Sequence, residues 1–357
     1  MQNKFKAAKN ILAQTSKTIV SRITNQPQKI YGIFFEVTDA CNSRCRHCNI
    51  WQQKPTADLL TPKEIEKIFR NPYFSGLQEI IISGGEALLR PDLEEVILIM
   101  HRYAKPNAFF SLSTNGLMPE RALKATQTLV ESGVNTIVGV SLDGIGENHD
   151  EVRGVKGNFE RVDRLFHELK KMQNRYKDNL NVTVGFTLSP LTVNSMKDVE
   201  AYSEKLGFLF LPQVYEEAPF YINEGNVDSV GKEAMIKAIE ELPFSLQKEI
   251  MLKAAKGEQI KFKCSSMETF FVLHCNGDVS PCLYWSNMRL GNLREKPIDE
   301  ILQSQAVKDA REKTISGCSR CYNTWGTGWS MKAWCPPLIN FLLRSTVEES
   351  LKSLKKS

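Results

Sequence analysis

The sequence lacks any long apolar segment. Among its 357 residues, no apolar run approaches the roughly 20 residues that cross a bilayer, and no continuous apolar stretch near the start marks a secretory signal. Repeats of solenoid period and low-complexity tracts are also missing. We therefore expect a globular, cytoplasmic protein rather than a membrane-spanning, secreted or repeat protein.

Acidic residues are missing from the first 30 positions, although the whole chain has a net charge of only +5. That net charge is too small to indicate a nucleic-acid partner. Lysines and apolar residues alternate at helical spacing near the start, which predicts a basic amphipathic helix at 1–29. Such a helix either packs on the protein as a solvated element or makes peripheral contact with an anionic membrane.

No cysteine lies between Cys48 and Cys264, although the chain has nine. Three of them stand near the start and six in the last hundred residues. In a reducing compartment, this clustering predicts metal binding rather than disulfides.

From residue 30 to 215, short β-type segments alternate with amphipathic helical segments. This alternation predicts parallel strands with right-handed crossovers. Six such units are too few for a closed eight-stranded barrel, so we expect a partial (β/α)6 barrel of the TIM type, with a doubly wound sheet as the alternative. The expected strands are 31–38, 77–83, 108–114, 134–142, 181–188 and 207–214, and the expected helices begin at 61 or cover 91–103, 119–131, 158–172 and 194–206.

The remaining sequence divides into a helical connector at 216–260, a small cysteine-rich domain at 261–337 and a closing helix or tail at 338–357. The connector predicts helices at 232–241 and 245–256. In the cysteine-rich part, the turn sequence Cys275-Asn276-Gly277-Asp278 predicts a hairpin of strands 269–274 and 279–285. A helix is expected at 297–313.

Cys41, Cys45 and Cys48 form a CxxxCxxC motif directly after the first expected strand. Active sites of parallel β/α barrels lie at the carboxyl ends of the strands. Three thiolates can hold three irons of a [4Fe–4S] cube and leave the fourth iron open, whereas structural zinc or a fully ligated cluster needs four ligands. On spacing alone, a zinc site completed by His47 or by a distant residue remains an alternative.

The motif resembles CxxxCxΦC, the signature of the radical S-adenosylmethionine (SAM) superfamily, with His47 as the aromatic residue Φ. Similar family motifs end the next three expected strands, at Gly84-Gly85-Glu86, Ser113-Thr114-Asn115 and Ser141-Leu142-Asp143, and Arg153 follows. Their convergence on four consecutive strand ends disfavours zinc. Ala87 stands where the family usually has proline, which leaves the role of the glycine backbone intact.

The resemblance implies an open [4Fe–4S] cluster that binds SAM, whose reductive cleavage yields a 5′-deoxyadenosyl radical. In the family, the GGE segment holds the SAM amino group and the arginine commonly meets the SAM carboxylate. A reducing partner such as flavodoxin or ferredoxin is also implied. The SAM-binding residues implied in this chain are Gly84, Gly85, Glu86, Ser113, Asn115, Ser141, Asp143 and Arg153.

A second set of thiols suits a fully ligated cluster or zinc. The arrangement resembles the auxiliary-cluster extensions called SPASM and, in the short form, twitch. Because the CxxCx₅Cx₃C run of full SPASM is missing, we expect one auxiliary [4Fe–4S] cluster, with a zinc ribbon as the alternative. The expected ligands are Cys264, Cys282, Cys318 and Cys321, while Cys275 and Cys335 are either substitute ligands or buried thiols.

The functional hypothesis is an oxidoreductase or maturase that acts on a small molecule or peptide and passes the substrate electron to the auxiliary cluster. The acidic base that some SPASM enzymes carry after the second cysteine is replaced by Leu283, so no catalytic base is assigned. The alternative is a bond-forming or methyl-transferring radical SAM enzyme with structural zinc. A nonenzymatic scaffold that binds nucleic acid is disfavoured by the SAM motifs.

Overall fold

The computed structural model describes residues 29–225, 231–243, 245–259, 264–315 and 318. The predicted N-terminal helix, the predicted C-terminal helix or tail, Cys321 and Cys335 therefore lie outside the described residues. Within these ranges, none of the helices is long and apolar enough to cross a membrane.

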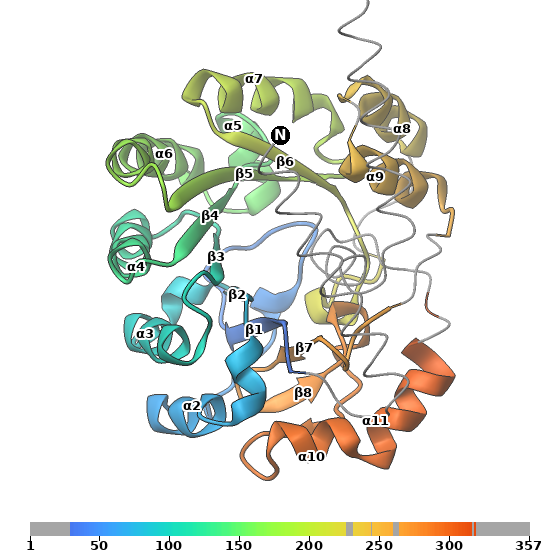
Figure 1. The fold of residues 1–357 in the computed structure, drawn as a ribbon. Helices are drawn as coiled ribbons and strands as arrows, with labels where there is room; N and C mark the ends of the chain where they lie inside the picture. Colours follow the sequence, from blue (N-terminus) through green and yellow to red (C-terminus); the bar gives the residue numbers. More distant parts are fainter. Residues whose placement is uncertain (1–28, 226–230, 244, 260–263, 316–317, 319–357) are drawn as a thin grey trace, which may run out of the picture.

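A single curved sheet organises the described chain (Figure 1). Its strands follow the order β6-β5-β4-β3-β2-β1-β7-β8-β9, and the first six are parallel to their neighbours, as predicted. The expected partial barrel of six strand–helix units is confirmed. These strands are β1 (Gly32–Thr38), β2 (Glu79–Gly84), β3 (Phe109–Thr114), β4 (Asn135–Ser141), β5 (Leu180–Leu188) and β6 (Leu209–Val214).

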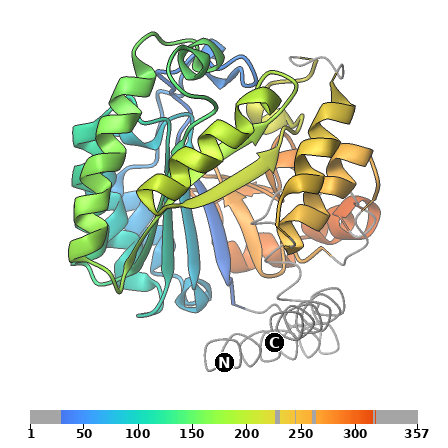
Figure 2. The ribbon, with the colours of Figure 1, turned by 90° about the horizontal axis from the view of Figure 1, so that it is seen from above.

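Amphipathic helices cover the outer face of the sheet (Figures 1 and 2). Alternate residues of β1, such as Ile33 and Phe35, point into the core beneath them, while Phe34 lies in a separate apolar cluster. Thr61 begins the first helix with the capping box that the sequence predicts with Glu64. The helices are α2 (Pro62–Phe69), α3 (Leu93–Tyr103), α4 (Pro119–Glu131), α6 (Asn158–Arg175) and α7 (Met196–Leu206), with short turns η1 (Ile50–Gln52), η2 (Pro72–Gly76), η3 (Ala87–Leu89) and η4 (Val193–Ser195).

One short helix, α5 (Glu147–Arg153), was not anticipated. It lies between β4 and α6 and ends at Gly154, whose positive φ of 67° closes the helix. The connector forms η5 (Pro219–Tyr221), α8 (Lys232–Glu241) and α9 (Leu246–Lys256), in agreement with the two expected helices. Figure 2 shows this helix pair, in which α9 lies beside β6 and α8 packs against α9.

The cysteine-rich part extends the barrel sheet past β1. β7 (Phe270–Leu273) pairs with β1 in parallel, and β8 (Asp278–Ser280) and β9 (Gly291–Asn292) continue the sheet with antiparallel pairing. The expected second hairpin strand stops early, because Pro281 lacks a ladder donor and the chain turns into η6 (Leu283–Trp285). The expected helix at 297–313 is also wrong in part, since Ser304 is extended and caps a new helix. In place of one helix, the structure has α10 (Ile298–Gln303), α11 (Gln305–Ala310) and a π-turn η7 (Arg311–Ile315).

Candidate active site

The loop after β1 holds Cys41 and Cys48 half-buried on either side of a buried Cys45. Cys45 is buried, whereas Arg44 and Arg46 on either side of it are exposed. The backbone N–H of Arg44 donates to the carbonyl of Arg153 (3.0 Å), and that of Arg46 donates to the carbonyl of Val152 (2.9 Å). The unanticipated helix α5 therefore holds the cysteine loop in place.

The thiols of this loop are strongly shielded from water. Burial, together with the charges of the other thiols of the loop, raises the pKa of Cys41 to about 11 and that of Cys48 to about 12. Bound metal removes such protons, because only the thiolate is a ligand. Among the described residues, no three His, Cys, Asp or Glu side chains converge on a single-ion site.

Two glycines let the end of β2 approach the cysteine loop. A Cβ on Gly84 would lie 2.0 Å from the carbonyl oxygen of Thr38, and one on Gly85 would lie 2.3 Å from that of Ala40. The same contact is closed by hydrogen bonds from Gly85 N–H to Thr38 (2.9 Å) and from Glu86 N–H to Ala40 (2.8 Å). The GGE segment is thus locked onto the loop, and only glycine fits there.

Glu86 is almost completely buried and already has partners. Its carboxylate accepts hydrogen bonds from Thr114 Oγ1 (2.8 Å) and from the N–H of Asn115 (2.7 Å). Burial raises the pKa of Glu86 to about 7, against the effect of these hydrogen bonds. Asn115 in turn donates from Nδ2 to Asn42 Oδ1 (2.9 Å). The acid therefore joins the ends of β2 and β3, and its expected contact with the SAM amino group remains a prediction.

A buried ion pair joins the end of β4 to the cysteine loop. Arg153 Nη2 lies 2.7 Å from Asp143 Oδ2, and Arg153 Nη1 lies 3.7 Å from Cys45 Sγ. The other carboxylate oxygen of Asp143 accepts the N–H of Thr187 (2.8 Å). The arginine charge holds the pKa of Asp143 below its usual value although burial acts in the opposite direction. His149 completes the group by accepting the N–H of Asp143 at Nδ1 (3.1 Å).

The expected auxiliary ligands gather in the cysteine-rich part. Burial, together with the neighbouring thiols of Cys264 and Cys318, raises the pKa of Cys282 to about 12. Cys275 faces elsewhere: its thiol lies beside Asp39 and Thr56, next to the loop after β1. The structure thus brings together three of the four expected ligands and places Cys275 apart from them.

Two family models match this chain in the regions that carry the two cysteine sets. The model of the radical SAM superfamily matches residues 35–193, and a SPASM model, described as an iron–sulfur cluster-binding domain, matches residues 264–322. The chain is a radical SAM enzyme with a C-terminal SPASM domain.

Curated relatives of this radical SAM enzyme carry two kinds of name. A "Probable GTP 3′,8-cyclase" of Methanococcus aeolicus is 29% identical over 72% of this chain and 86% of its own length. An "Fe-coproporphyrin III synthase" of Methanosarcina barkeri is 25% identical over 75% of this chain and 72% of its own length. The names differ, so these relatives support the family without agreeing on one reaction.

Solved structures support the fold. Streptococcus suis SuiB bound to the precursor peptide SuiA has a TM-score of 0.61 and 15% identity, and the match covers 83% of this chain and 70% of SuiB. AnSMEcpe with bound AdoMet and the Cp18Cys peptide has a TM-score of 0.54 and 17% identity, over 87% of this chain and 98% of the other.

The radical SAM domain implies a [4Fe–4S] cluster and SAM, and the SPASM domain implies further iron–sulfur ligation rather than the zinc alternative. The residues present fit these groups. In the described chain, three buried nitrogens around the ion pair have no hydrogen-bond partner: Arg153 Nε, His47 Nδ1 and His149 Nε2. Buried polar atoms are rarely left unpaired, so this corner of the site is suited to a polar ligand.

Small side chains keep the inner face of the barrel open. Ser113 is exposed and Ser141 is half-buried at the ends of their strands, and they alternate with buried residues that face the outer core. Beside Ser141 in the sheet, a Cβ on Gly185 would meet only one backbone oxygen, at 3.8 Å. The predicted SAM residues Ser113 and Ser141 therefore line the same open surface.

Sequence reasoning missed a segment that covers the cysteine loop. We call residues 215–225 the strap. Asn223 is buried in it and donates from Nδ2 to the carbonyls of His47 (3.2 Å) and Glu216 (2.9 Å). The N–H of Asn49 donates to the carbonyl of Tyr221 (2.9 Å). The only sequence signal was the end of the strand–helix alternation after Val214, which does not reveal a contact across 176 positions.

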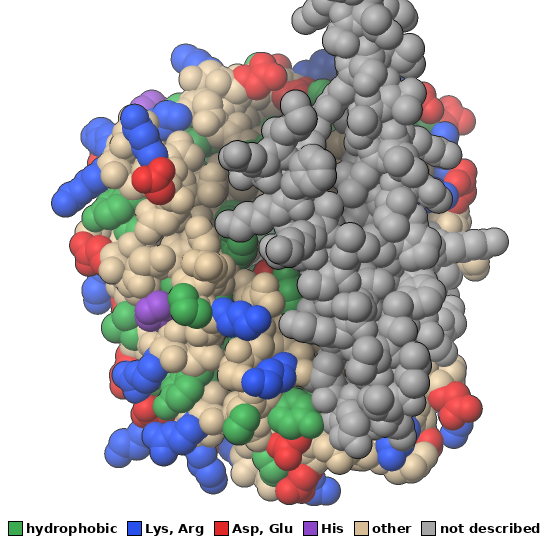
Figure 3. Space-filling model, viewed as in Figure 1, with side chains coloured by type: hydrophobic (Ala, Val, Ile, Leu, Met, Phe, Trp, Pro, Cys, Tyr) green, Lys and Arg blue, Asp and Glu red, His purple; other side chains and the backbone are tan. Residues whose placement is uncertain are grey.

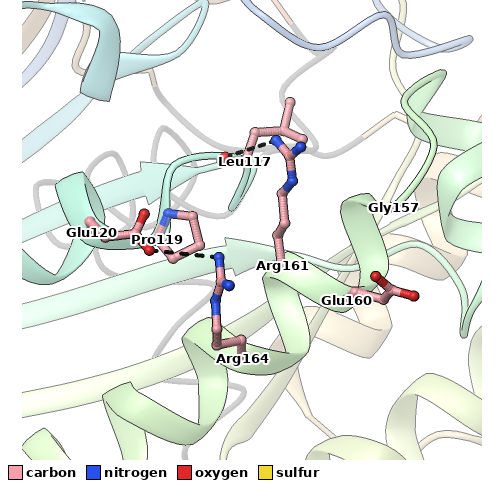
Figure 4. A pocket seen from close by; sticks show the side chains of 7 residues that line it. All are labelled: Leu117, Pro119, Glu120, Gly157, Glu160, Arg161 and Arg164. Atoms are coloured by element: carbon pink, nitrogen blue, oxygen red, sulfur yellow. Dashed lines mark hydrogen bonds and ion pairs between the residues drawn. The ribbon is translucent and has the colours of Figure 1, made fainter.

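A cavity of about 450 Å³ opens between the N-terminal parts of α4 and α6 (Figure 4). Its arginines are held by neighbours within the same wall: Arg161 Nη1 lies 3.4 Å from the carbonyl of Leu117, and Arg164 Nη2 lies 3.6 Å from Glu120 Oε1. No predicted SAM or cluster residue lines this cavity, so it is not part of the active site.

Proposed function

We propose that this enzyme removes a hydrogen atom from a substrate carbon and passes the substrate's remaining electron to the auxiliary cluster. The observation that carries the proposal is the pairing of β7 with β1. It fixes the SPASM part directly beside the strand that leads to Cys41. Leu283, next to Cys282, also lies in one apolar cluster with Phe34 and Phe220, against which Cys41 and Cys48 pack. The two ligand sets therefore flank a common apolar wall.

Reductive cleavage of bound SAM supplies a 5′-deoxyadenosyl radical that takes the substrate hydrogen. The protein's own residues bind and orient. Arg153 is suited to the SAM carboxylate, because Nε is unpaired while Asp143 fixes the guanidinium. The backbone of Gly84 and Gly85 is suited to the SAM amino group. The strap and the apolar wall exclude water from the side of Cys48.

The substrate class in this proposal is a small molecule or a peptide. Peptide substrates are favoured by two structural neighbours, SuiB bound to its precursor peptide SuiA and anSMEcpe with the bound Cp18Cys peptide. We further propose a cytoplasmic enzyme that takes its electron from a flavodoxin or ferredoxin and whose basic residues 1–29 are suited to peripheral membrane contact.

Anaerobic turnover tests the proposal. Reconstituted protein with SAM and dithionite is expected to release 5′-deoxyadenosine, and Cys45→Ala is expected to abolish the release. Candidate peptides and small molecules are then screened for faster release. For a substrate found in this way, Cys282→Ala is expected to retain SAM cleavage but to lose oxidised product. Oxidised product at the wild-type rate in Cys282→Ala would contradict an electron route through the auxiliary cluster.

A ring-forming reaction is the second candidate, favoured by the relatives named GTP 3′,8-cyclase. GTP added to the same assay separates the two. Acceleration of 5′-deoxyadenosine release by GTP, with hydrogen taken from the nucleotide, would support the cyclase. Release at the same rate with and without GTP would count against the cyclase.

A further inference from the structure

A small cavity lies between the loop after β1 and the β7–β8 hairpin. Its volume is about 110 Å³. One wall is polar, with Glu36, Asp39 and His274, and another is apolar, with Phe220 and Ile222. The cavity therefore offers both a polar anchor and an apolar surface, and it adjoins residues that flank both cysteine sets.

Glu36 presents an unpaired carboxylate oxygen at this cavity. Its Oε2 lies 2.6 Å from Nδ1 of His274, while no hydrogen bond from a described residue reaches Oε1. The side chain is only 10% exposed. A carboxylate that is nine-tenths buried is unfavourable unless its oxygens are paired. The open oxygen is thus an acceptor to which no residue of the described ranges donates.

The neighbouring polar groups do not supply that donor. Nε2 of His274 lies 2.7 Å from the Ser280 hydroxyl, so both ring nitrogens are engaged. Asp39 is also satisfied, because both of its oxygens accept hydrogen bonds from Thr56. Arg289 lines the cavity but lies 3.7 Å from Asp278 and is largely exposed. Glu36 is the acidic group that stays open to a ligand.

At the mouth of the cavity, Ile222 has an uncommon backbone conformation. Ile222 has φ of 52° and is 44% exposed. A β-branched residue rarely adopts this left-handed conformation, which persists only where the surroundings enforce it. Here the carbonyl of Ile222 accepts a hydrogen bond from Asn49 Nδ2 (2.9 Å), so the cysteine loop itself keeps an apolar side chain at the mouth.

We propose that this cavity is a substrate subsite that binds a hydrogen-bond-donating group, an ammonium or a hydroxyl, on an aliphatic stem. Glu36 accepts from the polar group, and Phe220 and Ile222 contact the stem. The inference rests on the proposed function for its place in the reaction: Phe220 belongs to the apolar cluster against which Cys48 packs, so the stem is held beside the SAM cluster.

Ligand binding to the reconstituted full-length protein tests the subsite. The probes are n-butylamine, n-butanol and n-butyrate, and saturation-transfer NMR measures their binding. We expect at least threefold more transfer to butylamine than to butyrate. Transfer to butanol as strong as to butylamine identifies a general donor site, and weaker transfer identifies an ammonium site. Equal transfer to butyrate and butylamine would overturn the proposal.

Variants tie the binding to the cavity. Glu36→Gln is expected to lower butylamine transfer at least threefold, whereas Glu160→Gln, on the outer helix α6, is expected to leave it unchanged. Ile222→Lys places a competing ammonium at the mouth and is expected to reduce transfer, while the uncharged Ile222→Met retains it. This second pair does not touch the buried Glu36–His274 contact and so does not depend on the folding of Glu36→Gln.

The assay needs neither SAM nor a reductant, which separates the two proposals. A protein that cleaves SAM but binds butylamine no better than butyrate would refute the subsite and leave the proposed function standing. Selective amine binding without SAM cleavage would support the subsite and refute the proposed function.

Discussion

At the scale of single residues, Arg153 connects the end of β4 to the cysteine loop. Its guanidinium pairs with Asp143 (2.7 Å) and approaches Cys45 Sγ (3.7 Å). Two directions of hydrogen bonding from one buried group require the planar fork of arginine, which the single ammonium of lysine does not reproduce.

Arg153→Lys is therefore expected to keep the charge but lose the second contact. We predict about a tenfold or larger loss in kcat/KM for SAM cleavage, the usual order for a displaced charge-assisted hydrogen bond. The measurement is 5′-deoxyadenosine release against SAM concentration. Arg161→Lys, on the outer rim, is the matched control. Equal losses in both variants would refute a specific role for Arg153.

His149 predicts how stability depends on pH. Burial, together with the nearby Arg153 charge, lowers the pKa of this imidazole from 6.5 to about 4. The folded state therefore keeps His149 neutral where the unfolded chain takes up a proton. Its contribution is present above pH 6.5 and is lost as pH falls toward 4, by about 3 kcal/mol for a shift of this size.

His149→Asn retains an acceptor for the Asp143 N–H and removes the titration. Its urea midpoint is expected to fall less than that of the wild type between pH 7.5 and pH 4.5. His167→Asn removes an exposed histidine of α6 and is expected to follow the wild type. If His149→Asn loses stability in parallel with the wild type, the acid sensitivity lies elsewhere.

At the scale of elements, the strap is a structural cover for the SAM-cluster loop. Asn223→Ala removes the donor from the buried carbonyl of His47 and from the partly buried carbonyl of Glu216, at a cost of about 1–3 kcal/mol for a buried group that is left unpaired. We predict that iron leaves the protein several-fold faster in the presence of a chelator. Asn179→Ala, which removes a hydrogen bond to Val130 beside α4, is the control. The same release rate in both variants would show that the strap does not protect the cluster.

The sequence was most informative where structure is local. The β-branched segments and the strand-end motifs predicted six parallel strands, and the CxxxCxxC spacing predicted the loop at the end of the first. Helix α5 and the strap escaped prediction because contacts far along the chain determine them. In the sequence, nothing distinguishes Glu36 from the other residues of a buried strand, because its partner His274 lies 238 positions away. The single helix expected at 297–313 is an exception among local features, because it is interrupted at Ser304, which has an extended backbone and caps the next helix with its side chain.

At the scale of the whole molecule, one sheet carries both cysteine sets. β1 leads into the SAM-cluster loop, and its neighbour β7 belongs to the SPASM part. The visible surface adds no comparable organisation, because Figure 3 shows basic and acidic side chains interspersed on the described face. The arrangement implies that the two metal sites share a scaffold while keeping separate ligands.

Because the two metal sites have separate ligands, we predict that either site can lose its iron while the other keeps its cluster. With Cys41, Cys45 and Cys48 all changed to Ala, reconstituted protein is expected to retain about four irons per chain, as one fully ligated cube requires, and to lose SAM cleavage. With Cys264, Cys282 and Cys318 changed instead, the SAM cluster and SAM cleavage are expected to remain. Iron and sulfide analysis with the 5′-deoxyadenosine assay measures both. Loss of all iron in the first variant, with one zinc in its place, would show that the SPASM cysteines are structural and that the substrate electron leaves by another route.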